Sequence, residues 1–270
     1  REWLNGSTRT RFADRSMATT FFRPDRSVGV WAIGELAQGG SVWGAIGWAV
    51  VPAMILWGLA RAGERIRWPV MANLRAYLLW GAAPVALFVF GWTLVVNFAA
   101  SGDPAPLPYI PVLNPLDLAQ IGAFLGVVAW VVSLRRAGFA AGLATNMPVL
   151  AALGGGAVFI WLNAVLLRTL HHWAGVPFQL PAMMDSMLVQ ASLSIFWTLI
   201  ALCLMVFATR SVQRPLWMAG AVLMAVVTAK LFFVDLSNVG GIARIVSFLG
   251  VGLLLLVVGY FSPVPPKQAR

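Results

Sequence analysis

Charged residues are scarce in this sequence. They make up 10% of its 270 residues, whereas a soluble domain usually carries about 25%. Hydrophobic residues account for 60%, so too few polar side chains remain to cover a core of this size. This composition excludes a water-soluble domain and predicts an all-α, polytopic membrane protein. A membrane β-barrel is excluded as well, because its strands would show short alternating patterns and not long continuous apolar runs.

Cysteine and histidine are almost absent. The single cysteine, Cys203, lies within an apolar run, so neither a disulfide framework nor a cysteine metal site can form. The only histidines, His171 and His172, are adjacent, and adjacent side chains point in different directions on a helix. No third ligand with suitable spacing accompanies them, so we expect no metal site and no cofactor. Phosphate-binding, nucleotide-binding and hydrolase motifs are also missing.

Long apolar segments dominate what remains. A membrane-spanning helix needs roughly 20 apolar residues. Seven segments of about this length occur, at 40–60, 76–100, 117–134, 147–167, 186–209, 215–234 and 245–261. We therefore predict about seven transmembrane helices in a domain covering 40–261. An N-terminal segment, 1–39, precedes this domain, and a short tail, 262–270, follows it.

The charged residues predict the orientation of these helices. The net charge of +10 would suggest nucleic acid in a soluble protein, but here we interpret it as charge that orients the helices, and we expect no nucleic-acid partner. Basic residues gather in every second gap and in the tail, as Arg61, Arg65, Arg67, Arg75, Arg135, Arg136, Arg210, Arg214, Lys267 and Arg270. This pattern places those gaps and the C-terminus in the cytoplasm, and the other gaps outside.

The N-terminal segment conflicts with this orientation, because seven spans put residues 1–39 outside although they carry six arginines. The segment does not begin with methionine and does not resemble a signal peptide. We therefore expect the sequence to be the C-terminal part of a longer polypeptide, in which an upstream span delivers this segment. The alternative is that "VGVWAIGELAQ", at 28–38, dips into the membrane or lies on its surface.

Two short motifs have polar residues in positions that predict local structure. In "NPLDLAQ", Asn114 is a plausible helix N-cap, Pro115 fits the first helical position, and Asp117 favours the positive helix end. In "KLFFVDLSNVGGIARIVSFLG", charged residues stand between two apolar stretches. We expect Asp235 to pair there with Lys230 or Arg244 across a tight turn, because charges inside membranes usually pair with one another.

A second polar group follows the fourth segment. Arg168 and His172 share a face if the helix continues, and Asp185 opens the fifth segment. His171, His172 and Trp173 suit anchoring at the membrane interface, while a binding role predicts that Arg168, His172, Asp185 and Lys230 approach one another. Within the fifth segment Gln190, Ser194 and Trp197 form one stripe. This stripe indicates either hydrogen bonding between helices or one wall of an external cavity.

Four stretches give the chain a resemblance to a known family. They are "LNPLDLAQ", "RTLHHWAGVPF", "VQASLSIFWTLIAL" and "KLFFVDLSNVGGIARIVSFLGVGLLLLVVGY". Over most of residues 28–261 the chain resembles the C-terminal part of the bacterial predicted membrane proteins of domain of unknown function 2339. Members of that family are usually longer and have more spans. The resemblance supports the predicted topology and implies no particular substrate.

Three functional hypotheses remain open. Because no complete catalytic set can be named, the sequence favours a non-catalytic scaffold or assembly domain in the cell envelope. Its partners would be the lipid bilayer, the upstream part of the same polypeptide or other membrane subunits. The alternative is an enzyme or binding protein for a lipid-linked or anionic envelope substrate at the external face, and a transporter component is the third hypothesis. For the alternative, candidate catalytic residues are His171, His172 and Asp185, and candidate binding residues are Arg168, Gln190, Lys230, Asp235 and Arg244.

Overall fold

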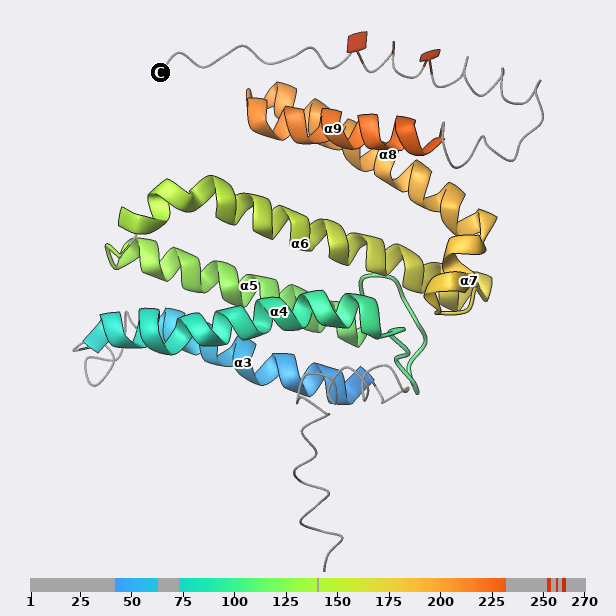
Figure 1. Cartoon of the computed structure of the whole chain (residues 1–270). Helices are drawn as coiled ribbons and strands as arrows, with labels where there is room; N and C mark the ends of the chain where they lie inside the picture. The colour runs from blue at the N-terminus through green and yellow to red at the C-terminus, as the bar shows by residue number, and fades with distance from the viewer. Residues whose placement is uncertain are drawn as a thin grey trace, which may run out of the picture. The chain divides into compact units, whose positions relative to one another are not determined.

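The computed structural model describes residues 42–62, 73–139 and 141–231, together with 252, 253, 256, 259 and 260. Every regular element in these ranges is helical (Figure 1). The elements are α3 (Val42–Ala62), the π-helix η2 (Ala76–Gly81), α4 (Ala82–Ala99), α5 (Pro115–Arg136), α6 (Ala141–Ala174), α7 (Leu180–Asp185), α8 (Met187–Arg210) and α9 (Arg214–Lys230). The predicted all-α fold is confirmed.

Five of these helices are long and apolar enough to cross a membrane, within the ranges just given. They cover Val42–Arg61, Ala76–Ala99, Pro115–Arg136, Asn146–Ala174 and Met187–Arg210. Two of the seven predicted spans are not among them. The sixth corresponds to α9, which has 17 residues and is shorter than the roughly 20 that a spanning helix needs. The seventh, at 245–261, lies mostly outside the described residues, as do residues 1–39 and 262–270.

Helix α6 is longer than the sequence predicts. It runs for 34 residues and includes the "GGG" run at 154–156 as well as Arg168, His171 and His172. Glycine lowers helix stability in water, but a helix in lipid must keep its backbone hydrogen bonds because no water can replace them. Because α6 continues through both Arg168 and His172, these two residues lie on one face of the helix, as the sequence predicts.

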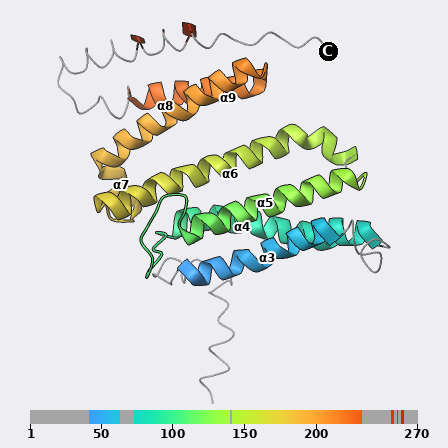
Figure 2. The same ribbon diagram turned by 180° about the vertical axis from the view of Figure 1, so that it is seen from behind.

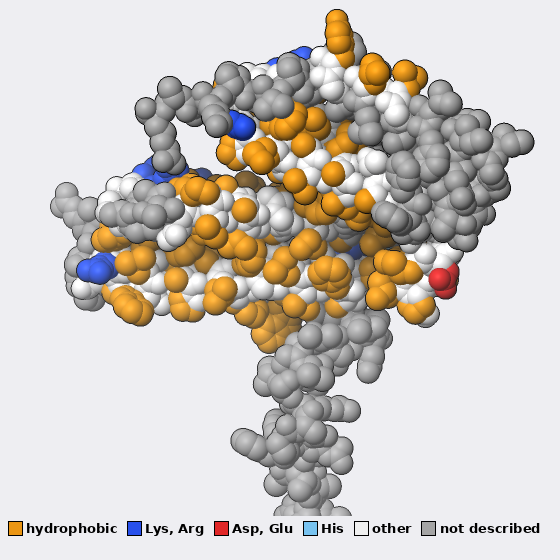
Figure 3. Space-filling view, turned by 45° about the horizontal axis from the view of Figure 1, so that its top comes forward, with side chains coloured by type: hydrophobic (Ala, Val, Ile, Leu, Met, Phe, Trp, Pro, Cys, Tyr) orange, Lys and Arg blue, Asp and Glu red, His pale blue; other side chains and the backbone are white. Residues whose placement is uncertain are grey.

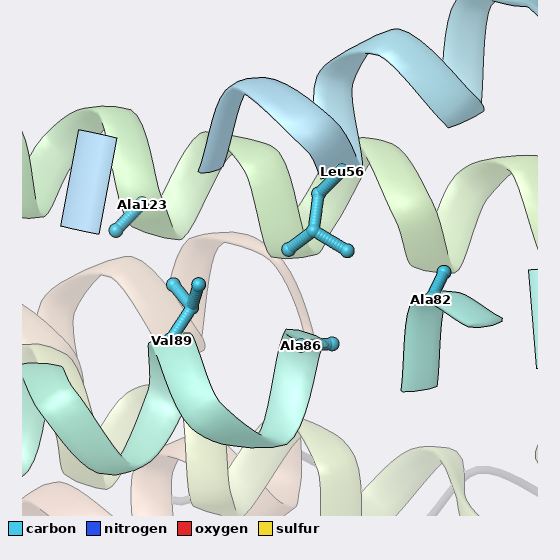
Figure 4. Close-up of a cluster of buried hydrophobic side chains, with 5 residues drawn as sticks. All are labelled: Leu56, Ala82, Ala86, Val89 and Ala123. Carbon is cyan, nitrogen blue, oxygen red and sulfur yellow. The ribbon is translucent and has the colours of Figure 1, made fainter. Parts of the chain in front are cut away.

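The chain divides into two compact units. The first unit comprises residues 1–105 and 119–141, and its described helices are α3, η2, α4 and most of α5. Its core consists of Leu56, Ala82, Ala86, Val89 and Ala123 (Figure 4). Three of these five are alanines, which allow the helix backbones to approach closely, as is typical of helix packing in membranes.

Two contacts tie α5 to the other helices of the first unit. A Cβ atom added to Gly126 would lie 3.3 Å from the carbonyl oxygen of Ala53 and 3.2 Å from the Trp57 ring, so α3 and α5 touch at this glycine. The indole Nε1 of Trp130 donates a hydrogen bond of 2.8 Å to the carbonyl oxygen of Leu78 in η2. Helix α5 therefore contacts both α3 and the second span, which begins with η2.

The second unit comprises residues 106–118 and 142–270, and its described helices are α6 to α9. Helices α8 and α9 form a hairpin around Ala201, Met205 and Met224. At Gly220 an added Cβ would lie only 2.7 Å from Met205 Cγ, so glycine permits this close packing. A short connection joins the end of α8 to the start of α9 (Figure 2).

The surface of the helices is apolar. Among the described residues in Figure 3, hydrophobic side chains occur all along the helices, and charged side chains are few. Large exposed hydrophobic residues on the flanks include Trp48, Met54, Leu87, Leu125, Ile195 and Leu199. Such a surface is stable only in an apolar environment, as the composition predicts.

Candidate functional site

The polar residues of the second unit gather where α5 begins and α6 ends. Helix α5 starts as predicted, because the Oδ1 atom of Asn114 accepts a 3.0 Å hydrogen bond from the backbone N–H of Asp117. The Asn114 side-chain amide also donates to the Asp117 carboxylate. The two side chains therefore bond reciprocally, much as in a capping box. This arrangement fixes the position of the Asp117 carboxylate at the start of the helix.

That carboxylate forms a buried ion pair with Arg168. The Nη1 atom of Arg168 lies 3.0 Å from Asp117 Oδ1, and both side chains have 0% exposure. The indole Nε1 of Trp161 donates to the same oxygen over 3.1 Å. Trp161 and Arg168 are seven residues apart, or about two helical turns, so they lie on one face of α6. Burying a charge is costly unless it is paired and hydrogen-bonded, and both conditions are met here.

The loop before α5 supplies two more contacts to this region. The backbone N–H of Val112 donates to the Asp117 carboxylate, and Val112 has a φ of 67°. A β-branched residue rarely adopts this left-handed conformation, so the hydrogen bond holds a strained turn in place. The hydroxyl of Tyr109 donates to the carbonyl oxygen of Val165 over 3.5 Å. Burial raises the pKa of the Tyr109 phenol above its ordinary value, so the hydroxyl remains protonated at neutral pH.

The two histidines contact two different loops. The ring of His172 stacks on Tyr109, with centroids 4.3 Å apart and planes 17° from parallel. The Nδ1 atom of His171 lies 2.7 Å from the carbonyl oxygen of Val176, and its ring packs edge-on against Phe178. Because a carbonyl oxygen only accepts, His171 Nδ1 carries the proton in this contact. Adjacent side chains on the last turns of α6 thus hold the loop before α5 and the loop after α6.

We refer to residues 106–114 and 175–186 together as the cap. Both segments lie beside the same end of α6 (Figures 1 and 2). Helix α7, within the second segment, contributes Met183 to a buried cluster with Val189 and Leu193. The histidines therefore fasten the cap to α6, and their anchoring at the membrane interface stays a prediction. Trp173, the next residue, is exposed, as an interfacial anchor requires.

A second polar group connects α8 with α9 and α6. The ammonium Nζ of Lys230 donates to Ser194 Oγ over 2.8 Å and to the carbonyl oxygen of Gln190 over 3.2 Å. Trp197 Nε1 donates to Asn163 Oδ1 over 2.7 Å. The stripe predicted on the fifth segment thus forms hydrogen bonds between helices, which was one of its two interpretations. The Gln190 amide instead bonds the carbonyl oxygen of Met184 in the cap.

The predicted site residues have distinct surroundings. Arg168 and His172 lie one turn apart on α6, but the carboxylate that pairs with Arg168 is Asp117, whereas Asp185 is exposed at the end of α7. Lys230 bonds α8 as described above. Asp235 and Arg244 lie outside the described residues, so their pairing with Lys230 stays a prediction. Among the residues that were placed, no group of three His, Cys, Asp or Glu side chains could hold a metal ion.

Sequence reasoning missed the partners of Arg168. Asp117 was interpreted only as a residue favourable to a helix start, and Trp161 and Tyr109 were not singled out. One signal was available, because the gaps that contain Asp117 and Arg168 fall on the same side of the membrane in the predicted topology. That signal narrows the choice of partners without identifying one, since it applies equally to Asp103 and Asp185.

The apolar helices, their buried polar contacts and their exposed hydrophobic surface define a polytopic α-helical membrane protein. The chain belongs to the family described as predicted membrane protein DUF2339, whose family model matches residues 27–265. This confirms the resemblance seen in the sequence. No curated protein and no solved structure matches the chain.

Proposed function

We propose that this chain is a non-catalytic scaffold or assembly domain of the cell envelope. The observation that supports this proposal most strongly is the ion pair of Asp117 and Arg168, in which both side chains are fully buried. A group that binds or transforms a substrate must be able to reach it. This carboxylate and this guanidinium contact each other and the protein, so their charges serve packing between helices and not chemistry.

The histidines support the same proposal. His171 donates to a backbone carbonyl and packs on Phe178, while His172 stacks on Tyr109. These contacts of the two rings fix the loops on either side of the end of α6. Positioning the cap is a sufficient explanation for both histidines.

The proposed location is a bacterial inner membrane with a cytoplasmic C-terminus. Arg61, Arg135, Arg136 and Arg210 stand at the C-terminal ends of α3, α5 and α8. The cap joins the opposite ends of the spans, and Asp185 is its only charged residue. The basic ends would therefore face the cytoplasm and the cap would face outward. Proposed partners are the lipid bilayer, other parts of the same polypeptide and other membrane subunits.

A comparison of protein abundance with phenotype tests the scaffold proposal. A strain lacking the protein is complemented with Arg168→Gln or His172→Ala, and any growth or envelope-stress defect is measured beside the amount of protein in the membrane. The proposal predicts that each variant loses phenotype in proportion to its loss of abundance. A variant that is fully abundant yet inactive at either position would contradict it. Arg135→Gln is the matched control, because Arg135 is an exposed arginine at the end of a span.

The binding of an anionic envelope substrate is the second candidate function, and Lys230 favours it. Its ammonium group donates to Ser194 Oγ and to the carbonyl oxygen of Gln190, which hold a cationic group beside the first turns of α8. Lys230→Met separates the two functions. If the chain is a scaffold, this variant loses activity only as far as it loses abundance. If Lys230 binds an anion, the variant stays abundant and loses activity, while Lys230→Arg retains part of it.

A further inference from the structure

The cap exposes large apolar side chains although it does not span the membrane. In the segment before α5 these are Leu107, Ile110, Val112 and Leu113, and in the segment after α6 they are Leu180 and Met184. Leu180 is 70% exposed. Asp185 is the only charged residue in the two segments. A loop in water usually carries polar residues on its outer surface, so this composition requires another explanation.

Helix α7 has one buried face and one exposed apolar face. Met183 is buried and packs in one cluster with Val189 and Leu193 of α8, so one face of α7 is fixed against the unit. Leu180 and Met184 are four residues apart and therefore lie together on another face of the same helix. Both are exposed. The short helix thus presents an apolar face away from the protein.

The apolar surface of the cap continues onto the membrane-spanning helices. Trp173 near the end of α6 is 67% exposed, and Met187 at the start of α8 is 80% exposed. Leu188, Ile195 and Leu199 extend the exposed apolar surface along α8. Because α6 and α8 both enter the membrane next to the cap, residues 175–186 must remain close to the bilayer surface. The Tyr109–His172 and His171–Val176 contacts hold both cap segments there.

We propose that the cap is embedded in the lipid leaflet at its end of the helices, with Leu180 and Met184 inserted below the headgroups. Segments at this depth are typically apolar on the inserted face and flanked by Trp or Tyr, which prefer the interface. Trp173 and Tyr109 occupy such flanking positions. Asp185 marks the part of α7 that stays in the headgroup layer. This lipid contact is independent of whether the chain is a scaffold, because it concerns only the environment of the cap.

Site-directed spin labelling in liposomes tests this proposal directly. The chain has one cysteine, so Cys203→Ser gives a cysteine-free background with a single change. Labels are attached at Leu180→Cys and Met184→Cys, and their collision rates with oxygen and with a water-soluble nickel complex give the depth of each label. The neighbouring Asp185→Cys is the matched control, and Leu199→Cys reports the lipid-facing side of α8. The liposomes contain phosphatidylcholine and phosphatidylglycerol.

The proposal predicts that the labels at 180 and 184 lie about 5–10 Å below the membrane surface. They should collide more often with oxygen than with the nickel complex, as the label at 199 should. The label at 185 should favour the nickel complex. Equal access of the nickel complex to all three cap labels would overturn the proposal, since the cap would then face water. Exclusion of both reagents at 180 and 184 would overturn it too, because a protein partner would cover them. If the cysteine variants misfold, a photoactivatable lipid added to the unmodified protein should label peptides containing 180–188, and the absence of such labelling would count against the proposal.

Discussion

Asp117 and Arg168 are separated by 51 residues in the sequence, yet their side chains meet at 3.0 Å with no exposure to the surroundings. The pair joins the first turn of α5 to the last turns of α6, and Trp161 and Asn114 also donate hydrogen bonds to the carboxylate. A buried pair of this kind adds little stability over well-packed neutral residues, but it is strongly destabilising when only one partner is removed. This asymmetry provides the first prediction.

Replacing Arg168 alone should destabilise the protein severely. Arg168→Gln leaves the Asp117 charge buried without its partner, so we expect a loss of about 3–5 kcal/mol in the free energy of unfolding. Unfolding by sodium dodecyl sulfate in mixed micelles measures this quantity. Arg135→Gln, at an exposed position, should change it by no more than about 0.5 kcal/mol. Equal effects of the two substitutions would show that the buried pair has no special role.

The N-cap of α5 should tolerate serine better than aspartate. Asp and Asn usually cap helices equally well, and loss of a cap in an Asn→Ala variant costs about 0.5–2 kcal/mol. Here the Asn114 amide donates to Asp117, so Asn114→Asp would place two carboxylates in contact. We expect the order of unfolding midpoints to be wild type, then Asn114→Ser, then Asn114→Asp. The reverse order of the two variants would show that capping alone determines stability at this position.

The protein should become less stable at alkaline pH, partly because the phenol of Tyr109 then loses its proton. Burial raises the pKa of its phenol above the ordinary 10.0, so the folded protein keeps a proton that the unfolded chain has lost. The resulting stabilisation is complete below about pH 10 and is lost as the pH rises from the unfolded towards the folded pKa. Tyr109→Phe should therefore make the alkaline fall in unfolding temperature shallower, measured between about pH 8 and pH 11.

Two glutamines allow a buried amide without a hydrogen-bond partner to be compared with a hydrogen-bonded one. Gln120 is fully buried, and neither polar atom of its amide has a hydrogen-bond partner among the described residues. Gln190 instead donates to the carbonyl oxygen of Met184 over 3.0 Å. Gln120→Met should leave stability unchanged or raise it, because an unpaired buried amide is costly. Gln190→Met should lower stability by about 0.5–1.5 kcal/mol. If Gln120→Met lowers stability more than Gln190→Met does, the Gln120 amide has a hydrogen-bond partner in the membrane.

The helices of this fold could be predicted closely from the sequence, because lipid imposes a strong constraint on apolar segment length. The predicted segments at 40–60, 117–134 and 186–209 agree with α3, α5 and α8 to within two residues at each end. The start of α5 was predicted from "NPLDLAQ" because capping depends on neighbouring residues alone. The end of α6 was predicted too early, since the polar residues after 167 resemble a loop although they remain helical.

The partners of the polar residues could not be predicted in the same way. Which acid meets Arg168 depends on the rotation and contacts of two helices that are far apart in the sequence, and several acids share its side of the predicted membrane. The stripe of Gln190, Ser194 and Trp197 was recognised from its spacing. Its partners Lys230 and Asn163 could not be assigned from that spacing, because helical periodicity identifies a face without indicating the helix that packs against it.

The central claim is that the buried pair only joins two helices. It is tested most directly by the function per molecule of a double variant, Asp117→Asn/Arg168→Gln. The double variant removes both charges together and keeps hydrogen-bonding amides at both positions, so it should regain much of the abundance lost in Arg168→Gln alone. Complementation of the deletion strain, divided by the amount of protein in the membrane, is then the quantity to measure. The scaffold account predicts the wild-type value, because the pair only joins two helices. A double variant that is as abundant as the wild type but does not complement would show that the two charges themselves carry the function.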